Sequence, residues 1–226
     1  MAGCTLKIGP SPEMYLKSLH ELAVGDEPVP ISALAERLGH NVVSSTEMIH
    51  RLEGRGLVAH HPYHGVQLTP AGAEHARALV RRHRLWERFL FDVLGLEWGA
   101  VHTLACELEH AVGDEVTEAL DQRLGHPTHC PHGNPIPGSS TVPAERSESL
   151  ADVGPGEAAQ VIAVHPETED VLGYLARHDL QPGSAVTVES FDPASRSAVI
   201  RTSTAWVPLP PDVTSCLRVR RIEAAR

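Results

Sequence analysis

The order of helical segments and turn signals in the first 72 residues limits what this chain can fold into. Three segments carry apolar residues at the spacing of an amphipathic helix: 13–24, 31–38 and 42–55. Asn41 precedes the third segment and is expected to cap it, and residues 57–69 contain two strand-like runs around a turn. Helix, helix, turn, helix and hairpin is the order of a winged helix-turn-helix.

In such a motif the second helix of the pair reads the major groove of DNA with its first residues. Here we expect six residues to contact DNA, at base edges or at phosphates: Arg37, Asn41, Val43, Ser44, Glu47 and Arg51. The formal net charge of −10 argues against nonspecific nucleic-acid binding by the whole surface, so the contact must be local. A helical protein-interaction module without DNA is the alternative interpretation of this region.

The remaining chain predicts a helical part followed by a β-rich part. Three helices are expected over 70–94, 99–111 and 114–124. Residues 125–143 form a loop rich in Pro, Gly and His. Three short apolar runs with turns between them predict a small antiparallel barrel, with a helix near 168–177: 160–164, 185–189 and 198–201.

Potential metal ligands gather between residues 102 and 110, in a chain that contains 15 histidines. His102, Cys106, Glu109 and His110 fall within an arc of about 100° on one helical face. A solvated face would favour Lys, Arg and Glu, and a core face would favour Leu or Ala. His83 and Glu87 form a second pair four residues apart, although His83 could equally face solvent or DNA.

Several motifs across nearly the whole chain resemble the diphtheria-toxin-repressor family of iron- and manganese-dependent regulators. They lie at residues 13–16, 35–38, 51–58, 68–72, 82–88, 106–110 and 133–138. The resemblance implies a mostly α N-terminal part with a small C-terminal barrel of the Src-homology-3-like type. The domains then run over 1–72 (winged helix-turn-helix), 73–138 (helical dimerisation and metal binding), 139–156 (linker) and 157–226 (barrel).

The resemblance also implies two metal sites in each subunit. The primary, activating site falls on Met14, Cys106, Glu109 and His110. The ancillary site falls on His83, Glu87 and His102, with further ligands from the barrel. There the family offers a Glu and a Gln three residues apart, and in this chain Glu167 and Asp170 have that spacing and chemistry, although Thr168 and Val171 hold the aligned places.

A metal that ties the first helix to the dimerisation domain would orient the recognition helices of a dimer for successive major grooves. The expected function is therefore a repressor that binds double-stranded operator DNA as a homodimer and controls genes of metal uptake and homeostasis. Fe(II) or Mn(II) is the expected cofactor, and the two sulfur donors favour iron. Zinc, cobalt, nickel and cadmium are expected to bind in vitro.

Other functions remain open at this point. A metallohydrolase would also place His and Glu on helices, but the chain contains no HExxH motif and no Gly-rich phosphate loop, so we expect no enzyme. A thiol redox switch at Cys106 and a metal-independent winged-helix regulator are further alternatives. Four scattered cysteines, the lack of a long apolar run and the lack of an export signal predict a cytoplasmic protein without membrane contact.

Overall fold

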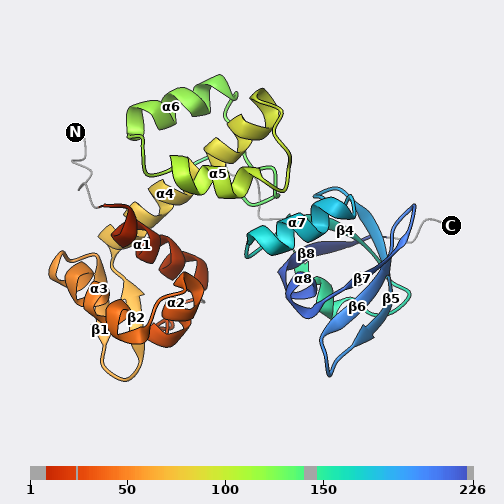
Figure 1. Cartoon of the computed structure of the whole chain (residues 1–226), viewed down its shortest axis with the longest axis horizontal. Coiled ribbons are helices and arrows are strands. Elements are labelled where there is room, and N and C mark those ends of the chain that lie inside the picture. The colour runs from red at the N-terminus through yellow and green to blue at the C-terminus, as the bar shows by residue number, and fades with distance from the viewer. Residues whose placement is uncertain (1–8, 24, 140–146, 223–226) are drawn as a thin grey trace. The chain divides into compact units, whose positions relative to one another are not determined.

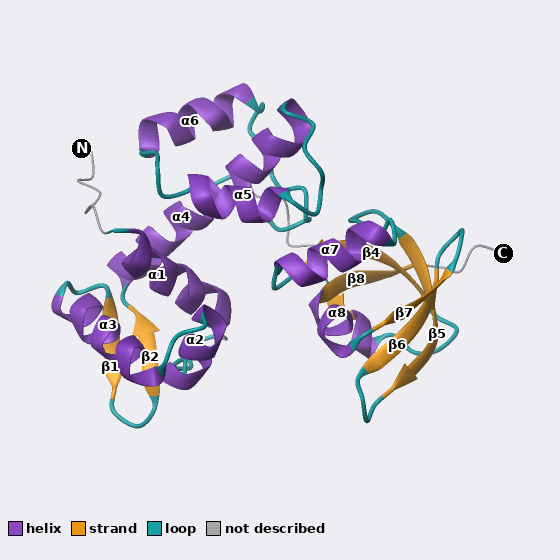
Figure 2. Cartoon of the chain, in the orientation of Figure 1, coloured by secondary structure: helices purple, strands orange, loops and turns teal. Residues whose placement is uncertain are grey.

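Three short helices and a two-stranded hairpin form the first of two units, Met1–Arg82 and His83–Arg226 (Figures 1 and 2). The computed structural model describes residues 9–23, 25–139 and 147–222. The elements of the first unit are α1 (Pro10–Leu22), α2 (Ile31–Leu38), α3 (Val42–Gly54), β1 (Val58–His61), β2 (Gly65–Leu68) and the beginning of α4 (Pro70–Arg88). This order confirms the winged helix-turn-helix.

Apolar residues at helical spacing explain how this unit holds together. Leu16, Leu19, Leu34, Ile49 and Leu52 are fully buried in one cluster that spans all three helices. The Asn41 side chain accepts a hydrogen bond of 2.8 Å from the Ser44 backbone N–H, and it caps α3 as expected. The first residues of α3 are therefore held in place at the protein surface.

Two short helices follow α4 in the second unit. A π-helical turn, η1 (Phe89–Val93), extends α4, and α5 (Val101–Leu108) and α6 (Asp114–Arg123) come next. Leu90 of η1 packs with Val101 and Ala105 of α5, while Leu120 of α6 packs with Leu85 of α4. These contacts fix the face of α4 that carries His83 and Glu87 against α5.

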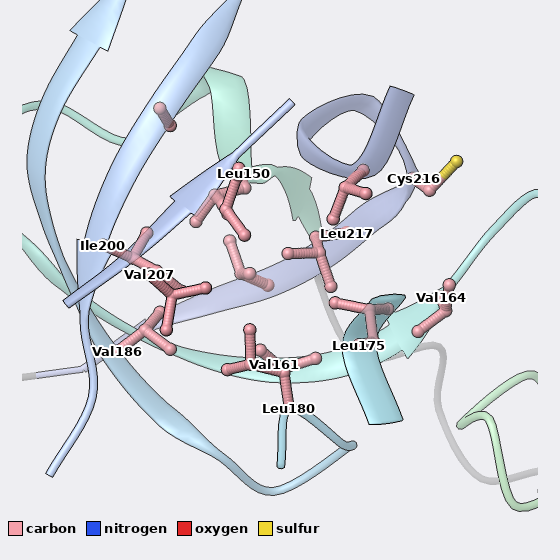
Figure 3. Close-up of a cluster of buried hydrophobic side chains, with 14 of the residues drawn as sticks. Leu150, Val161, Val164, Leu175, Leu180, Val186, Ile200, Val207, Cys216 and Leu217 are labelled. Carbon is pink, nitrogen blue, oxygen red and sulfur yellow. The ribbon is translucent and has the colours of Figure 1, made fainter. Parts of the chain in front are cut away.

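The rest of the second unit is a six-stranded antiparallel sheet with two helices. Its elements are β3 (Glu148–Ser149), the 3-10 turn η2 (Leu150–Asp152), β4 (Ala158–Val164), α7 (Glu169–Arg177), β5 (Ala185–Asp192), β6 (Ser197–Arg201), β7 (Trp206–Leu209), α8 (Pro211–Cys216) and β8 (Leu217–Ile222). Figure 3 shows Val186, Ile200 and Val207, from three neighbouring strands, gathered in the apolar core. Leu175 of α7 and Leu217 of β8 join this core.

The expected barrel is an open sheet. The strand order is β3-β8-β4-β5-β6-β7, and no ladder within the described ranges joins β7 back to β3. The two end strands are only two and four residues long, and Pro208 in β7 lacks an N–H to donate to a further strand. The sheet therefore has the antiparallel strands of a Src-homology-3-like domain, but it is not closed into a barrel.

Part of the segment expected to be a linker, 139–156, belongs to the sheet. Glu148 pairs with Val219 of β8, and Leu150 and Val153 are buried in the same apolar core as the strands. We propose that the C-terminal domain begins near residue 147. Within the described part of the chain, none of the helices combines the length and the apolar character that crossing a membrane requires.

Candidate metal centre

The last turns of α4 present His83 and Glu87 on one buried face. They are four positions apart in the sequence and therefore lie one turn apart, with His83 Nε2 2.9 Å from Glu87 Oε1. His102 on α5 completes a triangle, because its Nδ1 lies 3.1 Å from His83 Nε2 and 3.2 Å from Glu87 Oε1. The structure thus brings together the three helical residues expected at the ancillary site.

Glu167 joins these residues from the segment between β4 and α7. Its Oε2 lies 3.4 Å from His102 Nδ1 and 4.0 Å from His83 Nε2. Asp170 lies in the first turn of α7, is exposed and belongs to none of the donor groups that the described residues form. Of the two barrel residues considered, the structure places Glu167 at the centre and Asp170 away from it.

Two further donors, Cys130 and His132, come from the loop before residue 138. His132 Nδ1 lies 3.1 Å from Glu87 Oε1 and 3.6 Å from Glu167 Oε1. The Cys130 thiol donates to Glu167 Oε1 at 3.6 Å. Sequence reasoning missed both residues. A signal was present, because they directly precede the family motif at 133–138 within a loop rich in histidine.

A direct backbone contact holds this loop against β4. The Val164 N–H donates to the His132 carbonyl at 3.0 Å, and the Asn134 amide donates to the Val164 carbonyl at 2.8 Å and to Glu167 Oε1 at 2.5 Å. Gly133 has a φ of 85°, and a Cβ there would lie 1.9 Å from the Ile162 carbonyl oxygen. Only glycine permits this approach, which places His132 and Cys130 beside the carboxylates.

We call these six residues the buried cluster: His83, Glu87, His102, Cys130, His132 and Glu167. It contains two overlapping groups of four donors, and within each group all donor atoms lie within 4.8 Å of one another. The groups are His83, Glu87, His102 and Glu167, and Glu87, Cys130, His132 and Glu167. Glu87 Oε2 is buried without a hydrogen-bond partner among the described residues, so an acceptor remains for a cation. Carboxylate and imidazole donors at this spacing fit a divalent metal ion.

The electrostatics of the buried cluster also point to a cation. Burial raises the pKa of Glu87, but the charges of His83 and His132 and hydrogen bonds from His102 and His132 outweigh it and hold that pKa well below its usual value. Burial lowers the pKa of His102, yet hydrogen bonds to Cys106, Glu167 and Glu87 raise it to about 10. The pKa values of Glu87 and Glu167 are lowered and those of His102 and His132 are raised, so ionised carboxylates face protonated imidazoles whose protons a metal would displace.

The residues expected at the primary site lie at the end of α5. Glu109 is fully buried, and its Oε1 lies 3.4 Å from His110 Nε2. Cys106 Sγ lies 3.9 Å from His102 Nε2, in a donor group with His83. Met14 is half-buried on α1, in the first unit.

His83 connects the two sets of residues. Its Nδ1 lies 2.6 Å from Glu109 Oε2, and its Nε2 faces Glu87 Oε1. One imidazole ring therefore joins a carboxylate expected at the primary site to one expected at the ancillary site.

The residues expected to read DNA lie on or beside α3, apart from Arg37. Val43 is 71% exposed, and Ser44, Glu47 and Arg51 are exposed on the same helix. Arg37 of α2 forms an ion pair of 2.8 Å with Glu21 of α1. Its guanidinium thus has a structural partner within the unit.

Comparison with known proteins gives three family matches. Residues 7–66 match the profile described as the iron dependent repressor N-terminal DNA binding domain. Residues 69–138 match the iron dependent repressor metal binding and dimerisation domain, and residues 148–221 match the FeoA domain.

Individual relatives agree over most of the chain. The iron-dependent repressor IdeR of Mycobacterium leprae is 32% identical, over 93% of this chain and 96% of its own length. The diphtheria toxin repressor of Corynebacterium diphtheriae is 34% identical, over 80% of this chain and 84% of its own.

Solved structures show the same fold. A manganese-dependent transcriptional repressor in complex with manganese has a TM-score of 0.81 and 32% identity, and the match covers 93% of this chain and all of the other. The repressor ScaR with bound Zn²⁺ has a TM-score of 0.80 and 30% identity, over 93% of this chain and 99% of its own.

Proposed function

Because the chain belongs to the family of iron-dependent repressors, we propose that it represses transcription by binding operator DNA as a homodimer when Fe(II) or Mn(II) is bound. The family consists of DNA-binding regulators and not of enzymes. Its matched profiles include a DNA-binding domain and a dimerisation domain. Beyond this family membership, we propose operator DNA as the ligand, two metal sites, and the residues that bind the DNA and the metals.

The observation that carries this proposal is the buried cluster. Its donors come from four separate segments: α4, α5, the loop before residue 138 and the segment after β4. Without a cation these segments are held together by charged hydrogen bonds, and a divalent metal would supply a stronger link among the same groups. Metal binding would therefore stabilise one arrangement of the second unit over others.

We propose two metal sites per subunit. His83, Glu87, His102 and Glu167 hold the ancillary metal, and Cys130 and His132 form an overlapping donor pair beside it. Cys106, Glu109 and His110 hold the primary metal, and Met14 remains the proposed fourth donor on the resemblance of its sequence alone. The sulfur donors of the primary site, Cys106 and Met14, favour iron. The relatives include proteins named for iron and proteins named for manganese, so they support either ion.

The DNA contact is assigned to α3. Asn41, Val43, Ser44 and Glu47 would face the base edges, and Arg51 would contact phosphate. Arg37 of α2 would also contact phosphate, although its guanidinium already forms an ion pair with Glu21. The regulated genes are proposed to serve metal uptake and homeostasis, and the place of action is the cytoplasm.

Glu109 provides the direct test of metal activation. DNA binding would be followed by fluorescence anisotropy on the upstream regions of the protein's own gene and its neighbours. Each titration is run with Fe(II) under anaerobic conditions, with Mn(II), and with a chelator. We expect tight binding only with metal for the wild type, and loss of the metal response in Glu109→Ala and in Glu109→Gln. The second variant keeps the size and one acceptor of the buried side chain but removes its charge.

Glu107, which lies in the last turn of α5 two residues before Glu109, offers a matched control because it is exposed. Glu107→Gln should respond to metal like the wild type. Full metal-dependent binding by both Glu109 variants would place the activating site elsewhere. DNA binding that ignores the chelator but responds to peroxide would favour a redox switch at Cys106 instead.

A further inference from the structure

A separate group of metal-ligating side chains lies on the first unit, and it shares no residue with the metal sites proposed above. His50 and Glu53 lie three residues apart on α3, and His60 lies on β1. His50 Nδ1 is 3.7 Å from Glu53 Oε2, and the rings of His50 and His60 lie 5.4 Å apart, edge to face. One donor atom from each of the three side chains lies within 4.8 Å of the others.

The local backbone orients this group. The His60 backbone N–H donates to Glu53 Oε1 at 3.0 Å, so the carboxylate is held between the helix and the strand. Oε2 remains on the side of His50. The side chains of His50 and Glu53 are 58% and 41% exposed, so an ion can reach them from solvent.

The donor set selects a class of ion. A tetrahedral metal with bonds of about 2.0–2.2 Å to nitrogen and oxygen brings its ligand atoms to about 3.4 Å from one another. The donor atoms of His50, Glu53 and His60 lie within 4.8 Å of one another. Small rotations about the χ angles of these side chains would bring the atoms to the shorter spacing that the metal needs. Two imidazoles and one carboxylate suit zinc, cobalt and nickel, whereas Mn(II) favours sites made mostly of oxygen.

We propose that His50, Glu53 and His60 form a third divalent-metal site, which binds ions of the zinc, cobalt and nickel class with water at the open position. An ion there ties the helix α3 to the hairpin strand β1 and adds positive charge to an acidic protein at this point. The site stands on its own geometry and does not depend on the proposed repressor function.

Site-resolved chemical modification tests the proposal on the full chain. Diethyl pyrocarbonate modifies accessible imidazoles, and mass spectrometry reports each histidine separately, so metal at other sites does not obscure the result. We expect Zn(II) to protect His50 and His60 at least threefold, and Mn(II) at the same concentration to leave both reactive. His64 is exposed on the same hairpin outside the group, and it should be modified equally with and without zinc.

Glu53→Gln separates metal binding from a simple change of exposure. The variant keeps an oxygen that accepts from the His60 N–H but lacks the charge that a cation needs. It should lose the zinc protection of His50 and His60. Protection that persists in Glu53→Gln would overturn the three-ligand site, as would equal protection of His64.

Stoichiometry gives an independent measurement. Equilibrium dialysis with zinc should find one equivalent less per chain in the double variant H50Q/H60Q than in the wild type. His64→Gln should bind as much zinc as the wild type. Equal zinc content of the double variant and the wild type would refute the third site, whatever the state of the other two.

Discussion

Glu87 shows at the scale of single residues how the buried cluster is balanced. Its Oε1 lies 2.9, 3.2 and 3.1 Å from nitrogens of His83, His102 and His132, while its Oε2 has no hydrogen-bond partner among the described residues. A buried carboxylate is costly unless positive charge compensates it. Here the raised pKa values of His102 and His132 favour protonated imidazoles that provide this charge, so a metal ion that binds their nitrogens must displace protons.

The overlap of the two donor groups leads to a prediction about single ligands. With Mn(II), His102→Gln should weaken binding by about 10–100-fold, whereas Cys130→Ser should change the affinity far less. The reason is that burial and the charges of Glu87 and Glu167 raise the pKa of the Cys130 thiol to about 12, so it is neutral at physiological pH. A neutral thiol is a poor ligand for a hard ion.

Isothermal titration calorimetry on the two variants and the wild type checks this difference. His126→Gln is a suitable control, since His126 is mostly exposed and pairs with Asp121 outside the buried cluster. The reverse order, with Cys130→Ser as the damaging change, would assign the metal to the group of Glu87, Cys130, His132 and Glu167.

The residues on α3 that we expect to contact DNA lead to a second prediction at this scale. Ser44→Ala and Glu47→Ala should each change the preference among operator sequences by about 1–3 kcal/mol if they contact bases. Arg51→Ala should instead weaken binding to all sequences alike and flatten the salt dependence. Anisotropy titrations on a panel of single-base operator variants, at two salt concentrations, separate these effects.

Glu74 on α4 is exposed and serves as the control for these variants. Glu74→Ala should bind every operator like the wild type. If Ser44→Ala and Glu47→Ala also did so, α3 would not be the element that reads DNA sequence.

At the scale of elements, the contact between the loop and β4 decides where Cys130 and His132 lie. We predict that Gly133→Ala displaces this loop, because the new Cβ would overlap the Ile162 carbonyl. Both the melting temperature and the affinity for the ancillary metal should fall. Thermal unfolding and calorimetry with Mn(II) measure the two consequences.

Gly125 makes the comparison specific. It has a similar positive φ of 73°, but nothing lies within 4 Å of the position that its Cβ would occupy. Gly125→Ala therefore carries only the strain of a left-handed alanine, about 1–2 kcal/mol. Equal losses in the two variants would mean that strain, and not the contact with β4, matters at Gly133.

The sequence predicted most helices and strands, but it did not predict the contact between residues 130–134 and β4. Helical spacing and capping residues predicted α2 and α3 to within one residue, and the spacing of His83 and Glu87 placed them on one face. Such signals are local. The approach of residues 130–134 to β4 depends on backbone contacts between segments about 30 residues apart, so Cys130 and His132 were missed. The closure of the sheet was likewise overestimated, because it depends on how its end strands pair.

At the scale of the whole molecule, the second unit exposes several large apolar side chains over residues 93–116. Leu94, Leu104 and Val116 are 54%, 36% and 41% exposed, whereas Trp98, Val101 and Leu120 of the same region are buried within the subunit. The exposed residues fall inside the matched dimerisation domain. We therefore predict a two-fold homodimer whose interface contains these side chains.

The double variant L104D/V116D should be monomeric at micromolar concentration, because two charges would have to be buried in the interface. Size-exclusion chromatography with light scattering measures the mass directly. Val43→Asp, which changes an exposed residue of the first unit, should remain dimeric. A wild-type mass of one chain, 24.4 kDa, would refute the dimer.

The ring of His83, with Glu87 on one nitrogen and Glu109 on the other, makes the two proposed metal equilibria a single thermodynamic system. We predict that occupation of either proposed site fixes this ring, so that each metal changes the affinity for the other by the same factor, typically about 5–150-fold. The response to rising metal concentration is steeper than a one-site curve where this coupling is favourable, and shallower where it is unfavourable. The threshold at which the protein senses metal is set jointly by both sites.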